Sequence, residues 1–429
     1  MTKQIHSGIA AGQVSEGYKL EHGYVIPKEW KVVHFNECFH RLTQKNTENN
    51  QNVLTISAQQ GLISQLDYYN TLYASEDKTG YFLLQKGDFA YNKSYSADYA
   101  YGAIKQLEKY DKGIVSPLYI CFSANEGTNT DFYRQYFEAG MFNREIYKVA
   151  QEGARNHGLL NVSTPEFFSA ALVFPPVDEQ KKIAEVLLCC DRVIDLKQQL
   201  IIELQQLKNG FLQAVFPTKG CNKPDIRFPG FSEAWEQRKA VDLAEYSKGN
   251  GYSKGDLTDV GTPIILYGRL YTKYQFAINE VDTFAVPRSG AVYSQGNEVI
   301  VPASGETAED IARASAVEKS GVLLGGDLNI LRPFDFINPL FLALAISNGG
   351  PQNELAKKAQ GKSVVHIHNS DIQEVTIAYP SRTEQDRIVS VFRNLDHLIT
   401  LHQRELEETK KKKRGLAKLL LTGGVRVPT

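Results

Sequence analysis

The sequence of 429 residues has little of what marks several large classes of protein. Its five cysteines are an odd number without CxxC spacing, which favours reduced thiols over a disulfide framework or a zinc site. An apolar run of about 18 residues is missing, and the first residues lack the pattern of a secretory signal, so we expect a cytoplasmic chain. Neither sign of charge dominates, with 48 basic against 49 acidic side chains. No net positive field therefore attracts a polyanion, although a local basic face would still allow nucleic-acid binding.

The rest of the composition is that of an ordinary folded protein. Hydrophobic residues make up 42% and charged residues 23% of the chain, values that exclude a disordered or collagen-like protein. Because single domains usually contain about 100 to 200 residues, the length predicts two or three folded units.

The most informative feature is an internal repeat, in which matching residues lie 205 positions apart. The matches gather at two junctions, FPPVDEQKKIAEVL at 174–187 and YPSRTEQDRIVSVF at 379–392, and extend upstream to Trp30 and Trp235. Matched pairs include Pro175 with Pro380, Glu179 with Glu384, Gln180 with Gln385, Ile183 with Ile388, Asp191 with Asp396, Lys208 with Lys413 and Gly210 with Gly415. The repeat predicts two duplicated modules, each a variable globular part followed by a well-matched segment.

Each matched segment is predicted to form one long helix with a narrow apolar seam. No proline interrupts residues 177–216 or 381–427, and apolar residues recur at alternating spacings of four and three. The seam residues are Ile183, Leu187, Cys190, Ile194, Ile201, Leu204, Phe211 and Val215 in the first helix, and Ile388, Phe392, Leu395, Ile399, Leu406, Leu416 and Leu420 in the second. Such a seam is typical of a coiled coil, and the nearest partner for each helix is the other one, although a seam that pairs with another protein stays open. About 38 residues at about 1.5 Å each give a rod of roughly 57 Å.

The variable parts are predicted to mix helices and strands. Strands are expected at 32–35, 52–57, 116–122, 262–268 and 297–302, and helices at 131–150 and 338–359. A segment rich in proline and glycine, 216–230, predicts a linker before the second module.

Signatures of catalysis and of metal binding are all incomplete. The tripeptide GKS at 361–363 has Ala356 where a phosphate-binding loop needs glycine. The segment Asn338-Pro339-Leu340-Phe341 lacks the second proline of an adenine methyltransferase motif, and a Pro-Asp nuclease motif is not completed either. His366 and His368 have no apparent third ligand. We therefore expect no catalytic residue, no metal and no cofactor in this chain.

Two tyrosine-rich segments carry residue types that bind nucleic acid. YNKSYSADYAYGAIK at 91–105 and YGRLYTKY at 267–274 mix tyrosines with hydroxyl and cationic side chains, which contact phosphates and base edges. For the first segment, a tyrosine-rich sheet face that only packs is the alternative. The run KKKKR at 410–414 follows several glutamates, and we interpret it as a solvated face or a partner contact rather than as a phosphate site.

The repeat junctions also give the sequence a resemblance to a known family. With YVIPKEW at 24–30, IRFPGFSEAW at 226–235 and AQGKSVVHIH at 359–368, they resemble the specificity subunits of type I restriction-modification systems over nearly the whole chain. The resemblance implies an α+β protein in which two mixed α/β target recognition domains are separated by two long helices forming an antiparallel coiled coil, with an internal pseudo-two-fold repeat. The divisions expected are an N-terminal extension 1–20, recognition domains 21–177 and 230–381, helices 178–217 and 382–421, a linker 218–229 and a tail 422–429.

The resemblance also implies a function. Such a chain is not an enzyme; it recognises a bipartite, asymmetric target in double-stranded DNA and docks two adenine methyltransferase subunits and the restriction and translocase subunits. S-adenosylmethionine, ATP and Mg²⁺ would belong to those partners, in the prokaryotic cytoplasm beside the nucleoid and away from any membrane. The residues we predict to contact DNA are Asn92, Lys93, Ser94, Tyr95, Ser96, Tyr99 and Lys105 in the first domain, and Arg269, Tyr271, Lys273, Ser304 and Thr307 in the second.

Two other functions compete with this one. A two-domain scaffold whose tyrosine-rich surfaces bind proteins agrees with the balanced charge, and it would bind without the steep salt dependence of phosphate contacts. A standalone methyltransferase or nuclease is disfavoured by the incomplete motifs.

Overall fold

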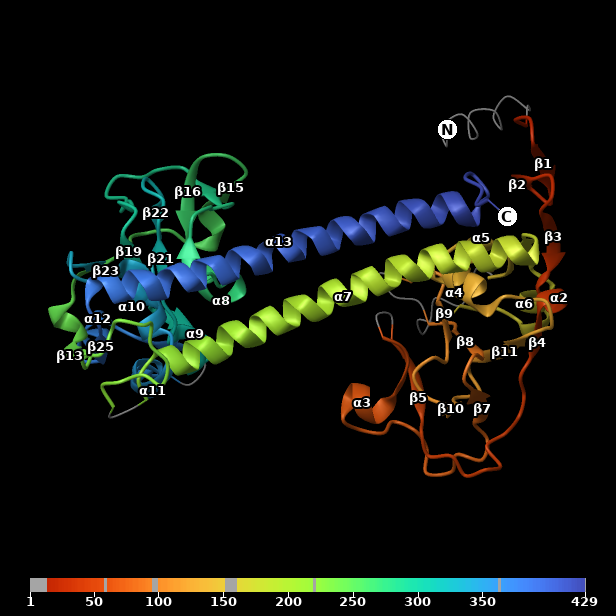
Figure 1. Ribbon diagram of the computed structural model, residues 1–429, viewed down its shortest axis with the longest axis horizontal. Helices are drawn as coiled ribbons and strands as arrows, with labels where there is room; N and C mark the ends of the chain where they lie inside the picture. The colour runs from red at the N-terminus through yellow and green to blue at the C-terminus, as the bar shows by residue number, and fades with distance from the viewer. Residues whose placement is uncertain are drawn as a thin grey trace. The chain divides into compact units, whose positions relative to one another are not determined.

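The chain divides into two compact units. The structure is a computed structural model, and it describes residues 14–57, 60–94, 99–150, 160–218, 221–361 and 364–428. The first unit comprises residues 1–198 with 405–429, and the second comprises residues 199–404. Two long helices, α7 (Val177–Val215) and α13 (Arg382–Leu421), each contribute one half to each unit (Figure 1).

The first unit is built on short antiparallel strands. Its largest sheet has the order β4-β11-β8-β9, and the remaining strands pair two by two. The strands are β1 (Tyr18–Glu21), β2 (Tyr24–Pro27), β3 (Lys31–His34), β4 (Phe39–Arg41), β5 (Leu54–Ser57), β6 (Gly61–Ser64), β7 (Phe82–Gln85), β8 (Phe89–Asn92), β9 (Ala103–Gln106), β10 (Lys112–Val115), β11 (Ile120–Ala124) and β12 (Ala171–Phe174). The short helices are α2 (Phe35–Cys38), α3 (Gln65–Tyr69), α4 (Thr130–Glu138), α5 (Asn143–Val149) and α6 (Thr164–Ser169).

The core of the first unit is aromatic. The Phe35 ring lies 5.0 Å from Phe122 and 4.8 Å from Phe167, centroid to centroid, and all three are fully buried. Because side chains alternate along a strand, β8 directs Phe89 and Tyr91 into this core and Ala90 into a second one on the other face of the sheet. The central strand is therefore covered on both faces.

The second unit contains a five-stranded sheet of order β14-β23-β19-β21-β17 and a four-stranded sheet of order β15-β18-β16-β22. The strands are β13 (Glu236–Lys239), β14 (Ala244–Lys248), β15 (Leu257–Thr258), β16 (Thr262–Ile265), β17 (Ala277–Ile278), β18 (Phe284–Ala285), β19 (Glu298–Pro302), β20 (Ser304–Gly305), β21 (Ser315–Val317), β22 (Leu323–Leu324), β23 (Leu328–Pro333), β24 (Val365–His366) and β25 (Thr376–Tyr379). The short α-helices are α8 (Arg269–Thr272), α9 (Ala308–Ile311), α10 (Pro339–Ile346), α11 (Gly349–Lys358) and α12 (Asn369–Gln373). Helix α10, PLFLALAI, is apolar on all sides and is buried from Leu340 to Ile346, as a helix in the centre of a core must be.

The predicted seams of the long helices are turned inward in each unit. In the first unit, Ile183 and Leu187 of α7 share a core with Ala417 and Leu420 of α13. Asp191 pairs with Lys413, and Lys197, further along α7, pairs with Glu405, which comes earlier on α13. These two halves are therefore antiparallel. In the second unit, the Phe211 and Phe392 rings lie 5.4 Å apart. Ile194, Ile201, Leu204, Ile388, Ile399 and Leu406 are also buried or half-buried, as predicted.

The structure confirms the mixed α and β class and corrects several details. The five strands expected from the sequence overlap β3, β5, β11, β16 and β19. Each of the two helices expected in the variable parts is divided in two, α4 from α5 and α10 from α11. Gly140, with a φ of +71°, and Gly349, with a φ of +58°, turn the chain at these breaks because glycine adopts positive φ without strain. The expected boundary at residue 20 falls inside β1, which pairs with β2.

Candidate nucleic-acid interface

The repeated Glu-Gln pair fixes each globular part to its long helix. The Gln180 side chain accepts a hydrogen bond from the Asn129 backbone N–H at 3.1 Å and donates one to the Pro175 carbonyl at 2.9 Å. Its repeat partner Gln385 does the same with Asn338 at 2.8 Å and Pro380 at 2.9 Å. Asn129 and Asn338 are the N-caps of α4 and α10, so one glutamine joins the strand exit, the long helix and a core helix in each unit.

The glutamates beside them are buried and paired with arginine. Glu179 accepts two hydrogen bonds from Arg426, at 2.6 and 2.8 Å, and a third from the Trp30 indole at 2.8 Å. Glu384 accepts two from Arg227, at 2.9 and 2.6 Å. A buried carboxylate requires such partners, and a bidentate arginine contact is among the strongest that a protein side chain can make to it. Neither arginine could be predicted from the sequence as a partner, because each is distant along the chain from its glutamate.

Three of the predicted DNA contacts in the first unit lie together where β8 ends. Asn92 and Lys93 are half-buried and Ser94 is exposed. The Asn92 side chain accepts a hydrogen bond from the Ser94 backbone N–H at 3.0 Å, which turns the chain there. Tyr95 and Ser96 lie outside the described residues. Lys93 is thus the cation of this group that solvent reaches.

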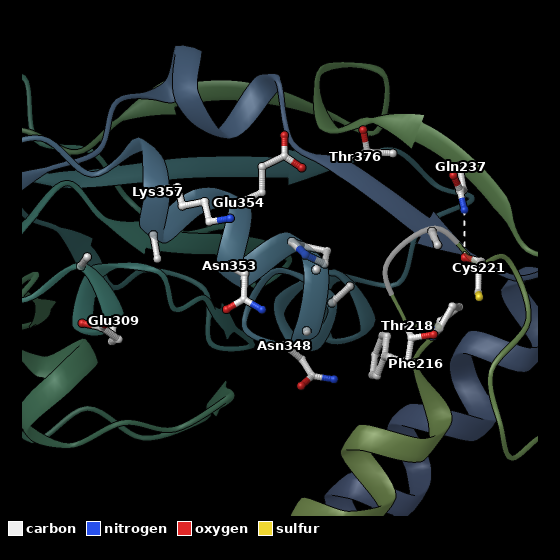
Figure 2. Close-up of a pocket in the computed structure, with 18 residues that line it drawn as sticks. Phe216, Thr218, Cys221, Gln237, Glu309, Asn348, Asn353, Glu354, Lys357 and Thr376 are labelled. Carbon is white, nitrogen blue, oxygen red and sulfur yellow. Dashed lines mark hydrogen bonds between the residues drawn. The ribbon is translucent and has the colours of Figure 1, made fainter.

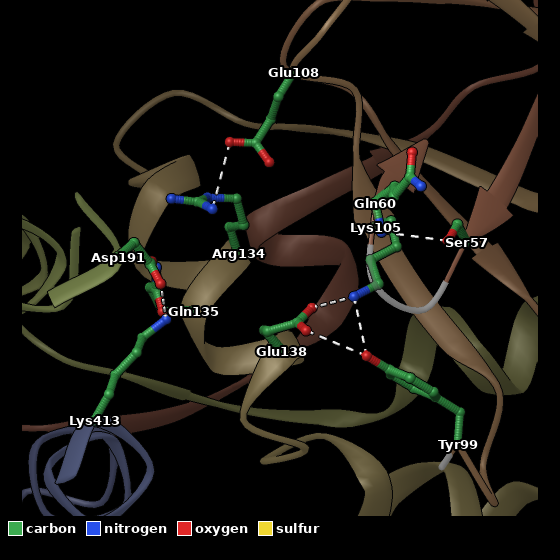
Figure 3. Close-up of polar contacts among 10 residues, drawn as sticks. All are labelled: Ser57, Gln60, Tyr99, Lys105, Glu108, Arg134, Gln135, Glu138, Asp191 and Lys413. Carbon is green, nitrogen blue, oxygen red and sulfur yellow. Dashed lines mark hydrogen bonds and ion pairs between the residues drawn. The ribbon is translucent and has the colours of Figure 1, made fainter. Parts of the chain in front are cut away.

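Tyr99 and Lys105 belong instead to a polar cluster with the exposed Glu138, shown in Figure 3, in which Lys105 is buried and Tyr99 half-buried. The Lys105 ammonium donates to Glu138 at 2.5 Å and to the Tyr99 hydroxyl at 3.1 Å. Burial opposes the charged lysine, but the Glu138 carboxylate outweighs it and raises the pKa of Lys105. Burial, followed by the Glu138 charge, raises the pKa of Tyr99. These contacts favour a structural role for both residues, although their contact with DNA stays a prediction.

The basic residues of the second unit are also paired. Arg269 and Lys273 both bind the Asp282 carboxylate, and their hydrogen bonds, Lys273 first, hold the pKa of Asp282 well below its usual range. The Arg269 side chain is only 9% exposed. Lys273 is more than half exposed, so it is the better placed of the two to meet phosphate.

The hydroxyl residues predicted in the second unit make local contacts. The buried Ser304 side chain lies 3.2 Å from His366 Nδ1, and Thr307 caps α9 by accepting from the Asp310 backbone N–H at 3.1 Å. Burial, and then the nearby Tyr267 and Glu306, raise the pKa of Tyr271. Ser304 and Thr307 therefore both have local structural roles.

Sequence reasoning missed an exposed aromatic surface in the first unit. Leu66, Tyr68, Tyr69, Leu72 and Tyr73 lie on α3 or just after it, and Tyr73 is 72% exposed. The rings of Tyr69 and Tyr73 meet edge to face at 5.1 Å. Helix α3 follows β6 as α8 follows β16, so QLDYYNTLY corresponds to YGRLYTKY in element order. An alignment of the modules with a shifted offset would have revealed this correspondence.

One cavity of the second unit is lined by both polar and apolar side chains. It measures about 960 Å³ and lies where α7 ends and α11 begins, with Thr218, Asn348 and Lys357 among its lining (Figure 2). The polar contact drawn there joins the Gln237 amide to the Cys221 carbonyl at 3.0 Å. Across the described ranges, no three His, Cys, Asp or Glu side chains are grouped to hold a metal ion. Within those same ranges, no helix is long and apolar enough to span a membrane.

Apolar side chains also line the outer faces of the long helices. On α7, Val186, Val193, Leu200 and Leu207 recur every seven residues and are 38%, 40%, 37% and 57% exposed. Leu398 on α13, which matches Val193 through the repeat, is 39% exposed. These exposed residues do not belong to the inner seam. Their regular spacing therefore indicates a second apolar surface.

Known proteins resemble the chain along its whole length. The family profile "Type I restriction modification DNA specificity domain" matches residues 232–411. Two specificity subunits of Methanocaldococcus jannaschii align with 96% of the chain, the type I restriction enzyme MjaVIII subunit at 21% identity and 96% of its own length, and the putative MjaX subunit at 23% and 98%.

Solved structures share the fold at low sequence identity. A type I restriction-modification S subunit from M. genitalium superposes with a TM-score of 0.54 at 12% identity, over 94% of this chain and 97% of its own. A chain from a structure on complex assembly and conformational transition of a type I restriction-modification system gives 0.56 at 15% identity, over 94% and 100%. The family profile covers residues 232–411 and both named relatives are specificity subunits, so the chain is similar to the DNA specificity subunits of type I restriction-modification systems.

Proposed function

We propose that the chain recognises a DNA target in two separated parts, one read by each unit, with α7 and α13 forming an antiparallel coiled coil between them. One observation supports this most directly. The ion pair Asp191–Lys413 of the first unit and the ion pair Lys208–Asp396 of the second are the same pair under the 205-residue repeat. A helix pair with pseudo-two-fold symmetry requires each such contact to occur twice, once in each unit.

The length of the helices accounts for a gap between the two parts of the target. Helix α7 has 39 residues and α13 has 40, which at about 1.5 Å per residue gives a rod of roughly 60 Å. One turn of B-DNA occupies about 34 Å, so the two units would meet the duplex more than one turn apart. The base pairs between them would remain unread.

Recognition in each unit is proposed to combine phosphate and base-edge contacts. In the first unit the candidates are Asn92, Lys93 and Ser94, since these residues reach solvent together. In the second unit they are Tyr271 and Lys273. Lys93→Gln and Lys273→Gln should each weaken target methylation severalfold without altering the melting temperature, because neither side chain is buried. Unchanged methylation rates at low and high salt would remove both residues from the interface.

Exposed apolar positions that the repeat retains on both long helices are the proposed docking surface for the methyltransferase subunits. Val193 and Leu196 on α7 have repeat partners Leu398 and Leu401 on α13, and all four are 39% to 70% exposed. Duplicated apolar surfaces would receive two identical partners. Restriction and translocase subunits would join the same complex, and S-adenosylmethionine, ATP and Mg²⁺ would bind to the partner subunits.

A protein-binding scaffold without DNA recognition is the second candidate function. The exposed Tyr68, Tyr69 and Tyr73 favour it, because Asp67, Glu76 and Asp77 surround them and would repel phosphate.

Genome-wide mapping of N6-methyladenine distinguishes the two functions. The chain would be co-expressed with the methyltransferase subunit from its source in a host free of adenine methylation. A single two-part motif with a fixed gap is the expected result. If no methylation appears while the partner is bound, and the same partner is active beside another specificity chain, DNA reading is refuted and the scaffold function takes its place.

A further inference from the structure

A basic face on the last half of α13 distinguishes it from its repeat partner. Lys410, Lys411, Arg414 and Lys418 occupy positions at which α7 carries Gln205, Gln206, Asn209 and Gln213. Residues three, four and seven apart share one side of a helix, so the four cations form a single stripe. The repeat has kept Lys208 and Lys413, which pair with aspartates, whereas these four positions differ in charge.

This stripe borders a groove of the first unit. The groove has a volume of about 620 Å³ and is lined by Lys410, Arg414 and Asn143, among others. Glu138, Asp191 and Glu407 also line it, but each carboxylate is already paired, with Lys105, Lys413 and Lys410 in that order. Figure 3 shows the first two of these pairs, with Gln135 also bound to Asp191.

The charge left over in the groove is positive. Arg414 has no ion-pair partner within 4.0 Å in the part of the chain that the structure describes. Lys411 and Lys418 do not line the groove, but both are exposed on the same side of α13 as Arg414. Lys412 lies on the opposite side of the helix, about 200° from Lys410, where it faces Glu408 at 3.9 Å.

Four neighbouring cations that α7 lacks are complementary to the anionic backbone of a DNA duplex. We propose that Lys410, Lys411, Arg414 and Lys418, with Asn143, bind backbone phosphates of the unread DNA next to the half-site of the first unit, in place of the solvated face or partner contact that the sequence favoured. This inference rests on the proposed function and extends it to base pairs whose sequence is not read.

The repeat itself supplies the test variant. Lys410→Gln, Lys411→Gln, Arg414→Asn and Lys418→Gln together place the side chains of α7 on α13, so the helix is expected to persist. The variant, assembled with its methyltransferase, would be titrated with target duplex over a range of salt concentrations. Each phosphate contact contributes about 0.9 to the magnitude of the slope of log affinity against log salt, so loss of all four contacts should reduce that magnitude by about 3.6. The methylated sequence should not change.

Two controls locate the contact. Lys412→Gln should leave the slope unchanged, because this lysine faces away from the groove. Methylphosphonates in the unread segment beside the first half-site should lower the slope for the wild-type assembly and have no effect on the four-residue variant.

Three results would overturn the site. An unchanged slope in an assembled, sequence-specific variant would show that the stripe does not bind DNA. Loss of methyltransferase or restriction subunits with the slope retained would assign the stripe to protein docking. If the wild-type assembly binds no target duplex in a salt-dependent manner, the proposed DNA reading fails and this site fails with it, a result distinguished from the first two because it needs no variant.

Discussion

The buried glutamates show how a single side chain stabilises a whole unit. Glu179 keeps a hydrogen bond to Trp30 in addition to its two bonds from Arg426. Glu384 depends on Arg227, because the Trp235 indole nitrogen is buried without a hydrogen-bond partner in the described structure. The two repeated sites are therefore not equal in energy.

We predict that Arg227→Ala destabilises the second unit by about 3 kcal/mol and that Arg426→Ala destabilises the first unit by less. In both variants a buried carboxylate loses its cation, but Glu179 retains the indole donor. Calorimetry or hydrogen exchange, resolved for each unit, measures the two losses. Lys112→Ala is the control, since its pair with Glu48 is exposed and contributes about 0.5 kcal/mol. Equal losses for the two arginines would contradict the asymmetry.

The five cysteines are predicted to differ in reactivity. Burial raises the pKa of Cys38 to about 11 and that of Cys121 to about 12, so neither forms thiolate near neutral pH, whereas Cys189 and Cys221 are exposed. Iodoacetamide at pH 8 should label Cys189 and Cys221 within minutes and leave Cys38 and Cys121 unlabelled until the protein unfolds. Peptide mapping by mass spectrometry gives each rate. Rapid labelling of Cys38 in the folded protein would show that the aromatic core is open.

Among the elements, the long helices were the most predictable from sequence. Their seam follows from the spacing of apolar residues along one helix, and α13 has the expected bounds 382–421. The expected bounds 178–217 lie within two residues of α7. The roles of Lys105 and Arg269 were not predictable, because their partners Glu138 and Asp282 depend on how separate strands and helices pack. Tyr91, the first residue of the tyrosine-rich segment, is buried and stacks on Phe167, so packing accounts for part of that segment.

A charge in the inner seam should unfold the helix pair. Leu187→Asp and Phe392→Asp each bury a carboxylate without a partner, which costs several kcal/mol, and the chain should lose its cooperative melting transition. Val193→Asp is the matched control on the outer face of α7, where the side chain is 40% exposed. It should melt normally and, under the proposed docking, lose the methyltransferase. Normal melting of the seam variants would contradict the coiled coil.

At the scale of the whole molecule, the duplicated modules predict that each unit determines its own half of the recognised sequence. Replacing residues 230–381 by the corresponding domain of another specificity subunit should change one half of the methylated sequence and leave the other half and the gap unaltered. The physical reason is that the rod and the first unit keep all their residues. Methylome mapping of the hybrid gives the result. A change in both halves, or in the gap, would mean that the two units do not read independently.

The hydrogen bonds of Gln180 and Gln385 determine which domains can be exchanged. Gln180 and Gln385 bind a backbone N–H at the first turn of a core helix, capped by Asn129 in one unit and Asn338 in the other. An incoming domain needs only a helix that begins with a capping residue at that place, whatever its recognition loops contain. Recombination between genes at the codons for Pro175–Gln180 and Pro380–Gln385 would thus exchange the recognition domains and retain the glutamine hydrogen bonds. New DNA specificities would then arise in one genetic step, without an intermediate protein that cannot fold.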